Sequence, residues 1–391
     1  MTKLTASFAT PVSLALAALL ACGCGSDSSG GGAKATSSGG VTPLPAFPTT
    51  GAPLTGADST WTWVDFPDTF CRDGSTAGVS VNMNSSSKDV MIFLEGGGAC
   101  FDTFTCGTNP TAVKTAALDQ TLGGGSAGVF DRTNPDNPMK DWNWVFVPYC
   151  TGDVHVGTID NGMVTGVTGQ QHFVGRNNIE AYLQRIVPTF PDASQVVLTG
   201  VSAGGFGAAS DYYLVQRAFG KIPVTSIDDS GPPMSDTYIP TCLQHEWRTT
   251  WGFDDSILKD CGAACPDPDN YELDYTKFVI DSVTNAGFKV QGGLLDSNDD
   301  GVISLFYGYG TSNCTGNFTT PVPAATYDAG LDDFRTFIQT VTPNYSTYYP
   351  ASTQHTWIAG PTFYTEAIDG TTIAQWFGNI VAGKPAQQIG N

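Results

Sequence analysis

Basic residues are scarce in this chain of 391 residues, which has 17 Lys plus Arg against 37 Asp plus Glu and a net charge of −20. Nucleic-acid binding needs clustered positive charge to meet phosphates, and the chain has no run of Lys or Arg, so we expect no nucleic-acid partner. The body of the chain also lacks an apolar run long enough for a transmembrane helix. An apolar content of 41% is nevertheless too high for disorder and indicates a globular protein.

The N-terminus has the pattern of a bacterial export signal. Lys3 precedes an apolar stretch over residues 12–21, and Cys22 follows directly. The ending Leu-Leu-Ala-Cys resembles the lipobox of bacterial lipoproteins, in which the peptide is cut before the Cys and the Cys takes a lipid. We expect residues 1–21 to be a signal peptide and Cys22 to be the lipidation site of an exported protein; an ordinary secretory signal is the alternative.

The next segment, residues 22–58, consists largely of Gly, Ser, Thr, Ala and Pro. Such a stretch has too little apolar surface to offset its ordering entropy, so we expect a disordered tether. The folded domain is expected over residues 59–391, with its first element near Trp61.

Beyond the signal boundary the chain has an even set of cysteines, which predicts disulfides in an oxidising compartment. Zinc is the alternative, but the spacings match no common zinc site, and no metal or other cofactor is expected. The eight residues are Cys71, Cys100, Cys106, Cys150, Cys242, Cys261, Cys265 and Cys314.

Buried strands and helices alternate along the domain, which predicts an α/β fold with a mostly parallel sheet and helices on both faces. The functional site of such a sheet lies at the carboxyl ends of its strands. A segment rich in Pro, Cys and Trp, residues 232–270, interrupts the alternation and is expected to be an insertion. We expect strands at residues 89–95, 144–147, 195–199, 223–227, 288–295 and 345–349, and helices at 179–186 (ended by Pro188), 212–219, 275–285, 331–341 and 372–381.

The strongest local motif is Gly-Val-Ser-Ala-Gly, residues 200–204, between a predicted strand and a predicted helix. In a nucleophile elbow the turn is so sharp that only small residues fit beside the Ser. The small residues on either side of Ser202 therefore indicate a catalytic nucleophile; a plain strand-to-helix turn is the alternative.

A second motif, Glu-Gly-Gly-Gly at residues 95–98, follows another apolar strand. Backbone N–H groups of this glycine loop, together with that of Ala203, could form an oxyanion hole for acyl transfer. Phosphate binding is the rival use of a glycine loop, but no nucleotide-binding motif accompanies it.

A general base for Ser202 must come from four histidines. The chain order Ser, acid, His of hydrolases with this topology removes His155 and His172. His245 lies in the predicted insertion, whereas His355 follows the last expected strand, where a loop could reach back over the sheet. We therefore prefer His355.

The acid that orients the imidazole has two candidates, Asp229 and Asp296, and each ends an expected strand. We prefer Asp296 because the acid normally follows a later strand than the one directly after the nucleophile. Residues 296–301 also match the first half of a calcium-binding EF-hand loop, but Tyr307 stands where a bidentate Glu is needed.

Several motifs together resemble the pectin acetylesterase and Notum family of serine ester hydrolases. The resemblance covers residues 60–360 and implies an α/β-hydrolase fold, the triad Ser202, Asp296 and His355, and an oxyanion hole from Gly97, Gly98 and Ala203. It also implies disulfides joining Cys100 to Cys106 and Cys71 to Cys150. The matching pieces are residues 71–75, 93–100, 148–157, 200–205 and 229–231 and the region of Asp296.

These features predict a monomeric, exported ester hydrolase that removes a short acyl group, most plausibly acetyl, from a saccharide. Its contact with a membrane is expected only through the lipid anchor. A lipase or polyesterase acting on longer acyl chains and an inactive glycan-binding surface protein are the alternatives.

Overall fold

The computed structural model describes residues 42–109, 111–112, 127–315, 318 and 320–390. The predicted signal peptide, the predicted lipidation site at Cys22 and residues 22–41 of the predicted tether lie outside the described residues. Within the described part, no helix combines the length and the apolar character needed to cross a bilayer.

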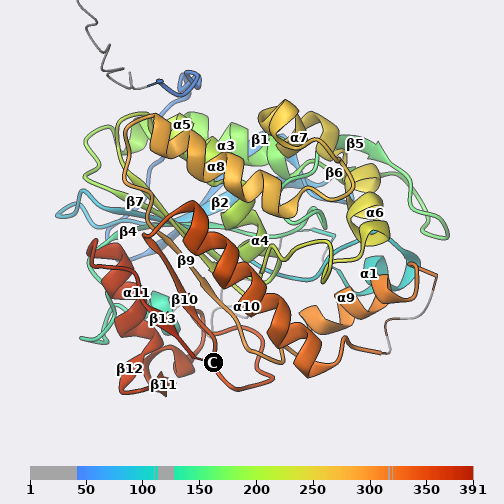
Figure 1. Ribbon diagram of the computed structural model, residues 1–391. Helices are drawn as coiled ribbons and strands as arrows, with labels where there is room; N and C mark the ends of the chain where they lie inside the picture. Colours follow the sequence, from blue (N-terminus) through green and yellow to red (C-terminus); the bar gives the residue numbers. More distant parts are fainter. Residues whose placement is uncertain (1–41, 110, 113–126, 316–317, 319, 391) are drawn as a thin grey trace, which may run out of the picture. The chain divides into compact units, whose positions relative to one another are not determined.

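A nine-stranded sheet forms the centre of the domain (Figure 1). Its order is β1-β2-β4-β3-β7-β8-β9-β10-β13, antiparallel from β1 to β4 and parallel from β4 onward, which confirms the predicted mostly parallel sheet. The strands are Trp61–Phe70 (β1), Thr76–Asn82 (β2), Val90–Leu94 (β3), Asn143–Val147 (β4), Val196–Val201 (β7), Val224–Asp229 (β8), Gly292–Leu295 (β9), Tyr345–Tyr348 (β10) and Gln388–Ile389 (β13).

Two small antiparallel pairs lie outside this sheet. They are Ile159–Gly162 (β5) with Gln171–Phe173 (β6), and Ala367–Ile368 (β11) with Thr371–Thr372 (β12).

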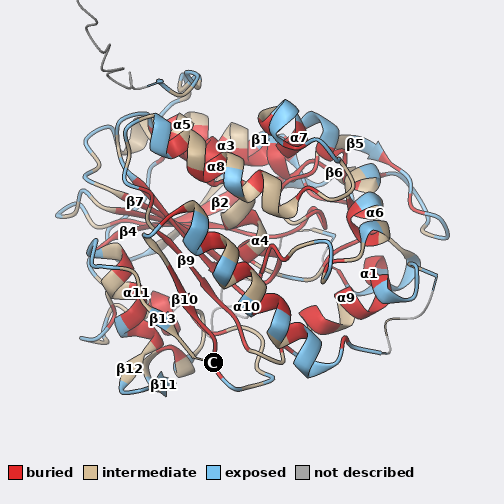
Figure 2. Ribbon diagram, in the orientation of Figure 1, coloured by how far each residue is buried: buried red, intermediate tan, exposed pale blue. Residues whose placement is uncertain are grey.

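Alternate side chains of the central strands enter two separate cores, as the pleat of a strand requires. In β3, Ile92 and Leu94 pack into one core with helices α3, α5, α8 and α10, whereas Met91 and Phe93 pack into the other core with α11. Figure 2 shows the strands buried between these layers. The helices named here are Gly175–Thr189 (α3), Tyr212–Phe219 (α5), Glu272–Asn285 (α8), Ala324–Val341 (α10) and Ile373–Val381 (α11).

The remaining helices lie around the carboxyl ends of the parallel strands or in the predicted insertion. They are Thr103–Thr108 (α1), Ala203–Ser210 (α4), Thr241–Trp251 (α6), Ile257–Cys261 (α7) and Ile303–Thr311 (α9). α6 and α7 fall within residues 232–270, so the predicted insertion is largely helical.

Two local expectations differ from the structure. Pro188 lies inside the last turn of α3, which ends one residue later at Thr189 rather than before the proline. Residues 42–58, the last part of the predicted tether, pack against the domain. The Gly51 amide donates to the Gln184 carbonyl at 3.1 Å, and Leu54 is 5% exposed, so this segment contributes apolar surface and backbone hydrogen bonds.

Four disulfides join the eight cysteines of the domain in the structure. Cys71 pairs with Cys150 and Cys100 with Cys106, the two pairings that the family resemblance implies. The four cysteines that the sequence left unassigned form the pairs Cys242–Cys314 and Cys261–Cys265.

Candidate active site

The candidate site lies at the carboxyl ends of the parallel strands, where an open α/β sheet places its ligands. The glycine loop follows β3, Ser202 follows β7, Asp296 follows β9 and His355 lies beyond β10. The glycine loop and His355, separated by more than 250 positions in the chain, thus line one cavity.

Ser202 sits in a strained turn between β7 and α4. Its φ of 58° and ψ of −123° are unusual for a residue with a side chain, and its amide donates to the Asp229 carbonyl at 2.8 Å. A Cβ added to Gly204 would lie 2.0 Å from the Leu94 carbonyl oxygen, so only glycine allows α4 to start this close to β3. These features have the geometry of a nucleophile elbow.

The predicted oxyanion donors surround Ser202. Ala203 is the first residue of α4, and its N–H therefore has no carbonyl partner within the helix. Gly98 has a φ of 80°, which favours glycine, and a Cβ added there would meet open space. The Asn109 side chain donates to the Gly97 carbonyl at 2.8 Å and so holds the peptide group that carries the Gly98 N–H.

His355 lines the same cavity as Ser202 and is held there by a carboxylate that the sequence analysis did not select. Its Nδ1 lies 2.7 Å from Oδ2 of Asp300, which is fully buried. The other oxygen of Asp300 accepts hydrogen bonds from the amides of Val302 and Ile303 at the start of α9, both at 2.8 Å. A carboxylate fixed by two amides can set the tautomer and orientation of the ring.

Asp296, the acid chosen from the sequence, makes different contacts. Its Oδ2 accepts a hydrogen bond from the Tyr327 hydroxyl at 2.6 Å, and the side chain is completely buried. Burial, reinforced by the charge of Asp300, raises the pKa of Asp296 well above its usual range. Asp296 bonds to Tyr327, whereas Asp300 contacts His355, so these contacts favour Asp300 as the acid that faces the imidazole.

The other candidate acid, Asp229, holds the loop that carries His355. Its Oδ2 accepts hydrogen bonds from the amides of Trp357 and Ile358, both at 2.8 Å. Burial raises its pKa to about 6, although these hydrogen bonds and nearby His355 oppose the shift. Asp229 is therefore a positioning residue for the loop.

The remaining histidines are engaged elsewhere. His155 is buried, its Nε2 lies 2.8 Å from the Glu95 carbonyl oxygen, and burial lowers its pKa to about 4. His172 contacts Asp160 and His245 contacts Asp269. Among the described residues, no cluster of three or more His, Cys, Asp and Glu side chains is arranged to hold a metal ion.

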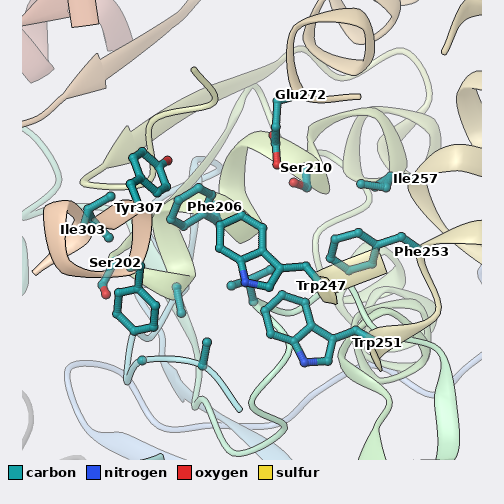
Figure 3. A pocket seen from close by; sticks show the side chains of 15 residues that line it. Ser202, Phe206, Ser210, Trp247, Trp251, Phe253, Ile257, Glu272, Ile303 and Tyr307 are labelled. Carbon is teal, nitrogen blue, oxygen red and sulfur yellow. The ribbon is translucent and has the colours of Figure 1, made fainter. Parts of the chain in front are cut away.

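Two cavities meet at Ser202 and Gly98. The first, here called the histidine cleft, is lined by Phe93, Glu95, Gly96, Gly97, Gly98, Val201, Ser202, Val302, His355, Thr356 and Ala359. The second, here called the aromatic pocket, has mostly apolar walls (Figure 3) and was not anticipated from the sequence. It is lined by Gly98, Ala99, Val154, Ser202, Ala203, Phe206, Ser210, Trp247, Trp251, Phe253, Ile257, Glu272, Ile303, Phe306 and Tyr307.

Buried acids in and near this site predict greater stability at mildly acidic pH. Burial raises the pKa of Asp153 and Asp229 to about 6 and that of Glu272 to about 7. The native state then binds more protons than the unfolded chain between about pH 4 and pH 7, so stability falls as pH rises through this window.

We expect the midpoint of thermal unfolding to be several degrees higher at about pH 5.5 than at about pH 8, which corresponds to a few kcal/mol. Calorimetry in buffers of equal ionic strength measures this difference. A higher unfolding midpoint at pH 8 than at pH 5.5 would contradict the raised pKa values of these buried acids.

Comparison with known proteins agrees with the motifs and the geometry. A family model described as pectinacetylesterase matches residues 59–251, which contain both the glycine loop and Ser202. Over these residues the chain is similar to the pectin acetylesterase and Notum family.

Curated Notum proteins match part of the chain. Palmitoleoyl-protein carboxylesterase notum2 of Xenopus laevis is 36% identical over 235 residues, which cover 58% of this chain and 42% of that protein. Palmitoleoyl-protein carboxylesterase NOTUM of Drosophila melanogaster is 27% identical over 174 residues, covering 41% of this chain and 26% of that protein. The chain therefore spans less than half the length of these curated relatives.

The Wnt deacylase Notum from Drosophila has a similar fold. Its solved structure superposes with a TM-score of 0.59 at 18% identity, covering 84% of this chain and 94% of that chain. At this identity the likeness concerns the fold alone, and it confirms the predicted α/β-hydrolase class.

Proposed function

We propose that the chain hydrolyses carboxylic esters with Ser202 as nucleophile, His355 as general base and Asp300 as the acid that orients the base. The observation that carries this proposal is the placement of Ser202, at a strained elbow, in one cavity with His355, whose ring lies 2.7 Å from Asp300. The family relationship supports the same chemistry.

In the proposed reaction His355 takes the proton of Ser202 as its oxygen attacks the ester carbonyl. The N–H groups of Gly98 and Ala203 stabilise the negative oxygen of the tetrahedral intermediate. The alcohol leaves with the proton from His355, and an acyl group remains on Ser202. Water then attacks this acyl-enzyme by the same route and releases the carboxylic acid.

The two cavities suggest how an ester lies in the site. Because Ser202 and Gly98 line both, the scissile carbonyl belongs at their junction. We place the acyl group in the aromatic pocket and the alcohol in the histidine cleft, where His355 can protonate it. The apolar walls of the aromatic pocket suit the acyl chain. The histidine cleft suits the leaving alcohol because His355, which lines it, can supply the proton that the alcohol needs.

The apolar residues that line the aromatic pocket favour an acyl group longer than acetyl. The pocket follows α4 from Ser202 to Ser210, and eight helical residues rise about 12 Å. An acetyl group would leave most of these apolar walls uncovered. Acetyl on a saccharide, preferred from the sequence, remains the second candidate because the matching family model is described as pectinacetylesterase.

A series of activated esters from acetate to octanoate tests this choice. Each methylene buried against the apolar walls is worth up to about 0.8 kcal/mol, so we expect kcat/KM to rise at least about tenfold along the series. Acetylated pectin fragments, assayed in the same way, test the second candidate substrate, an acetyl group on a saccharide. If kcat/KM is highest for the acetate ester, the proposal of a long acyl group is wrong. If none of these esters is hydrolysed, the proposal that the protein is an esterase is wrong.

We also propose that the protein is exported and held to a membrane by a lipid on Cys22. The apolar stretch at residues 12–21 and the Cys that follows support this proposal. The four disulfides agree with an oxidising compartment. We expect the domain itself to be monomeric.

A further inference from the structure

The far end of the aromatic pocket is polar. Phe206 and Ser210 are spaced four residues apart and therefore lie on one face of α4, and Ser202 directly precedes this helix; all three line the pocket. Figure 3 shows Ser202 at one end, and Ser210 and Glu272 at the other with their oxygens directed toward one another.

Between these ends the walls are flat and apolar. The rings of Trp247 and Trp251 are stacked, with centroids 5.9 Å apart and planes 10° apart, and Phe253 packs on Trp251 at 5.6 Å. Phe206 meets Trp247 edge-on. Such walls suit a flat ring or an extended chain and offer little to a charged group.

An acyl group that is apolar to its tip would leave the end of the pocket unsatisfied. It would meet the oxygens of Glu272 and Ser210 without supplying a hydrogen bond, which is unfavourable. A terminal carboxylate would be repelled by Glu272. Burial raises the pKa of Glu272 to about 7, so this group suits a neutral hydrogen-bonding partner better than a permanent charge.

A second, independent polar group lines the same pocket. The indole nitrogen of Trp247 is buried, and among the described residues it has no hydrogen-bond partner. Buried donors are rarely left without an acceptor in native proteins.

We propose that the aromatic pocket selects acyl groups with an apolar body and a hydroxyl at the far end, which hydrogen-bonds with Glu272 and Ser210. This inference rests on the proposed ester hydrolysis and names the substrate class of the same site. Two kinds of acyl group have this chemistry, the 4-hydroxycinnamoyl group and the ω-hydroxyalkanoyl group of medium length.

Matched pairs of methyl esters test the proposal. The pairs are 4-hydroxycinnamate with cinnamate, and 8-hydroxyoctanoate with octanoate. In the unaltered protein we expect kcat/KM for the hydroxylated member of at least one pair to exceed that of its partner by about tenfold or more. The pair that shows the preference identifies which of the two acyl groups, 4-hydroxycinnamoyl or ω-hydroxyalkanoyl, fits the pocket.

The variants Glu272→Leu and Ser210→Ala test which residues form hydrogen bonds with the hydroxyl of the acyl group. We expect Glu272→Leu to abolish the preference and Ser210→Ala to reduce it. Asp274→Leu is the matched control, because it removes another acidic residue from the same first turn of α8 but does not line the pocket. It should keep the preference. Labelling of Ser202 by a fluorophosphonate and the unfolding midpoint show whether each variant is folded.

The outcomes separate this inference from the function on which it rests. Hydrolysis of both pairs without preference for the hydroxyl overturns the inference and leaves the esterase intact. A preference that survives both Glu272→Leu and Ser210→Ala also overturns it. Absence of hydrolysis and of Ser202 labelling in the unaltered protein overturns the esterase itself.

Discussion

Replacing Asp300 by Asn is expected to lower kcat by about 10⁴-fold, whereas the same change at Asp296 is expected to lower it by less than about tenfold. Asp300 Oδ2 lies 2.7 Å from His355 Nδ1, so Asn would hold the ring in the wrong tautomer and remove the charge that stabilises the imidazolium. Asp296 accepts a hydrogen bond from Tyr327, and burial raises its pKa, which favours the neutral form. Asn has nearly the shape of a neutral Asp, so little should change.

Steady-state hydrolysis of one activated ester by both variants measures this contrast. Thermal unfolding provides the control, because Asp300 also accepts two amides at the start of α9 and its replacement could weaken that helix end. The ratio of the loss of kcat in Asp300→Asn to that in Asp296→Asn decides which carboxylate orients His355. A larger loss in Asp296→Asn than in Asp300→Asn would restore the acid chosen from the sequence.

Replacing Ser202 by Ala should remove at least about 10⁴-fold of the hydrolytic rate, since no other group can then form the acyl-enzyme. The fold should persist, because the turn is held by backbone contacts, including the hydrogen bond from the residue 202 amide to Asp229. We therefore expect stability to change by less than about 1 kcal/mol.

Ser202→Gly supplies the matched control for the elbow. Because the φ of 58° is unfavourable for a residue with a Cβ, glycine should relieve strain and stabilise the protein by about 1 kcal/mol while also being inactive. Calorimetry and ester hydrolysis on both variants test this pair. Substantial turnover by either one would remove Ser202 from the mechanism.

Local patterns carried most of what the sequence could predict. The strand, tight turn and helix around Ser202 lie within residues 196–210, so the motif indicates both the structure and the nucleophile. The apolar runs at β3, β4 and β7 likewise predict strands buried on both faces. The β1–β2 hairpin was missed because charged residues and Pro67 interrupt its alternation.

The acid could not be chosen from spacing, since Asp296 and Asp300 lie in one loop. Which carboxylate meets His355 depends on how the loop after β10 lies over the start of α9. The one local signal for Asp300 is its position three residues before the first residue of α9, where its carboxylate accepts two amide hydrogen bonds.

The aromatic pocket also escaped prediction, because its walls come from α4, α6, α7, α8 and α9 and from the segments between them. Trp247 and Trp251 are four residues apart and therefore indicate a shared helix face. What that face packs against is decided by tertiary structure. The contact of Trp251 Nε1 with the Cys100 carbonyl at 2.8 Å joins residues 151 positions apart.

Covalent labelling with a fluorophosphonate, followed by mass spectrometry of the digested protein, tests the central claim most directly. If Ser202 is activated by His355 and Asp300, one adduct forms, it maps to Ser202, and its formation slows strongly in His355→Ala. A protein that stays unlabelled, or that carries the adduct on another residue, would contradict the account.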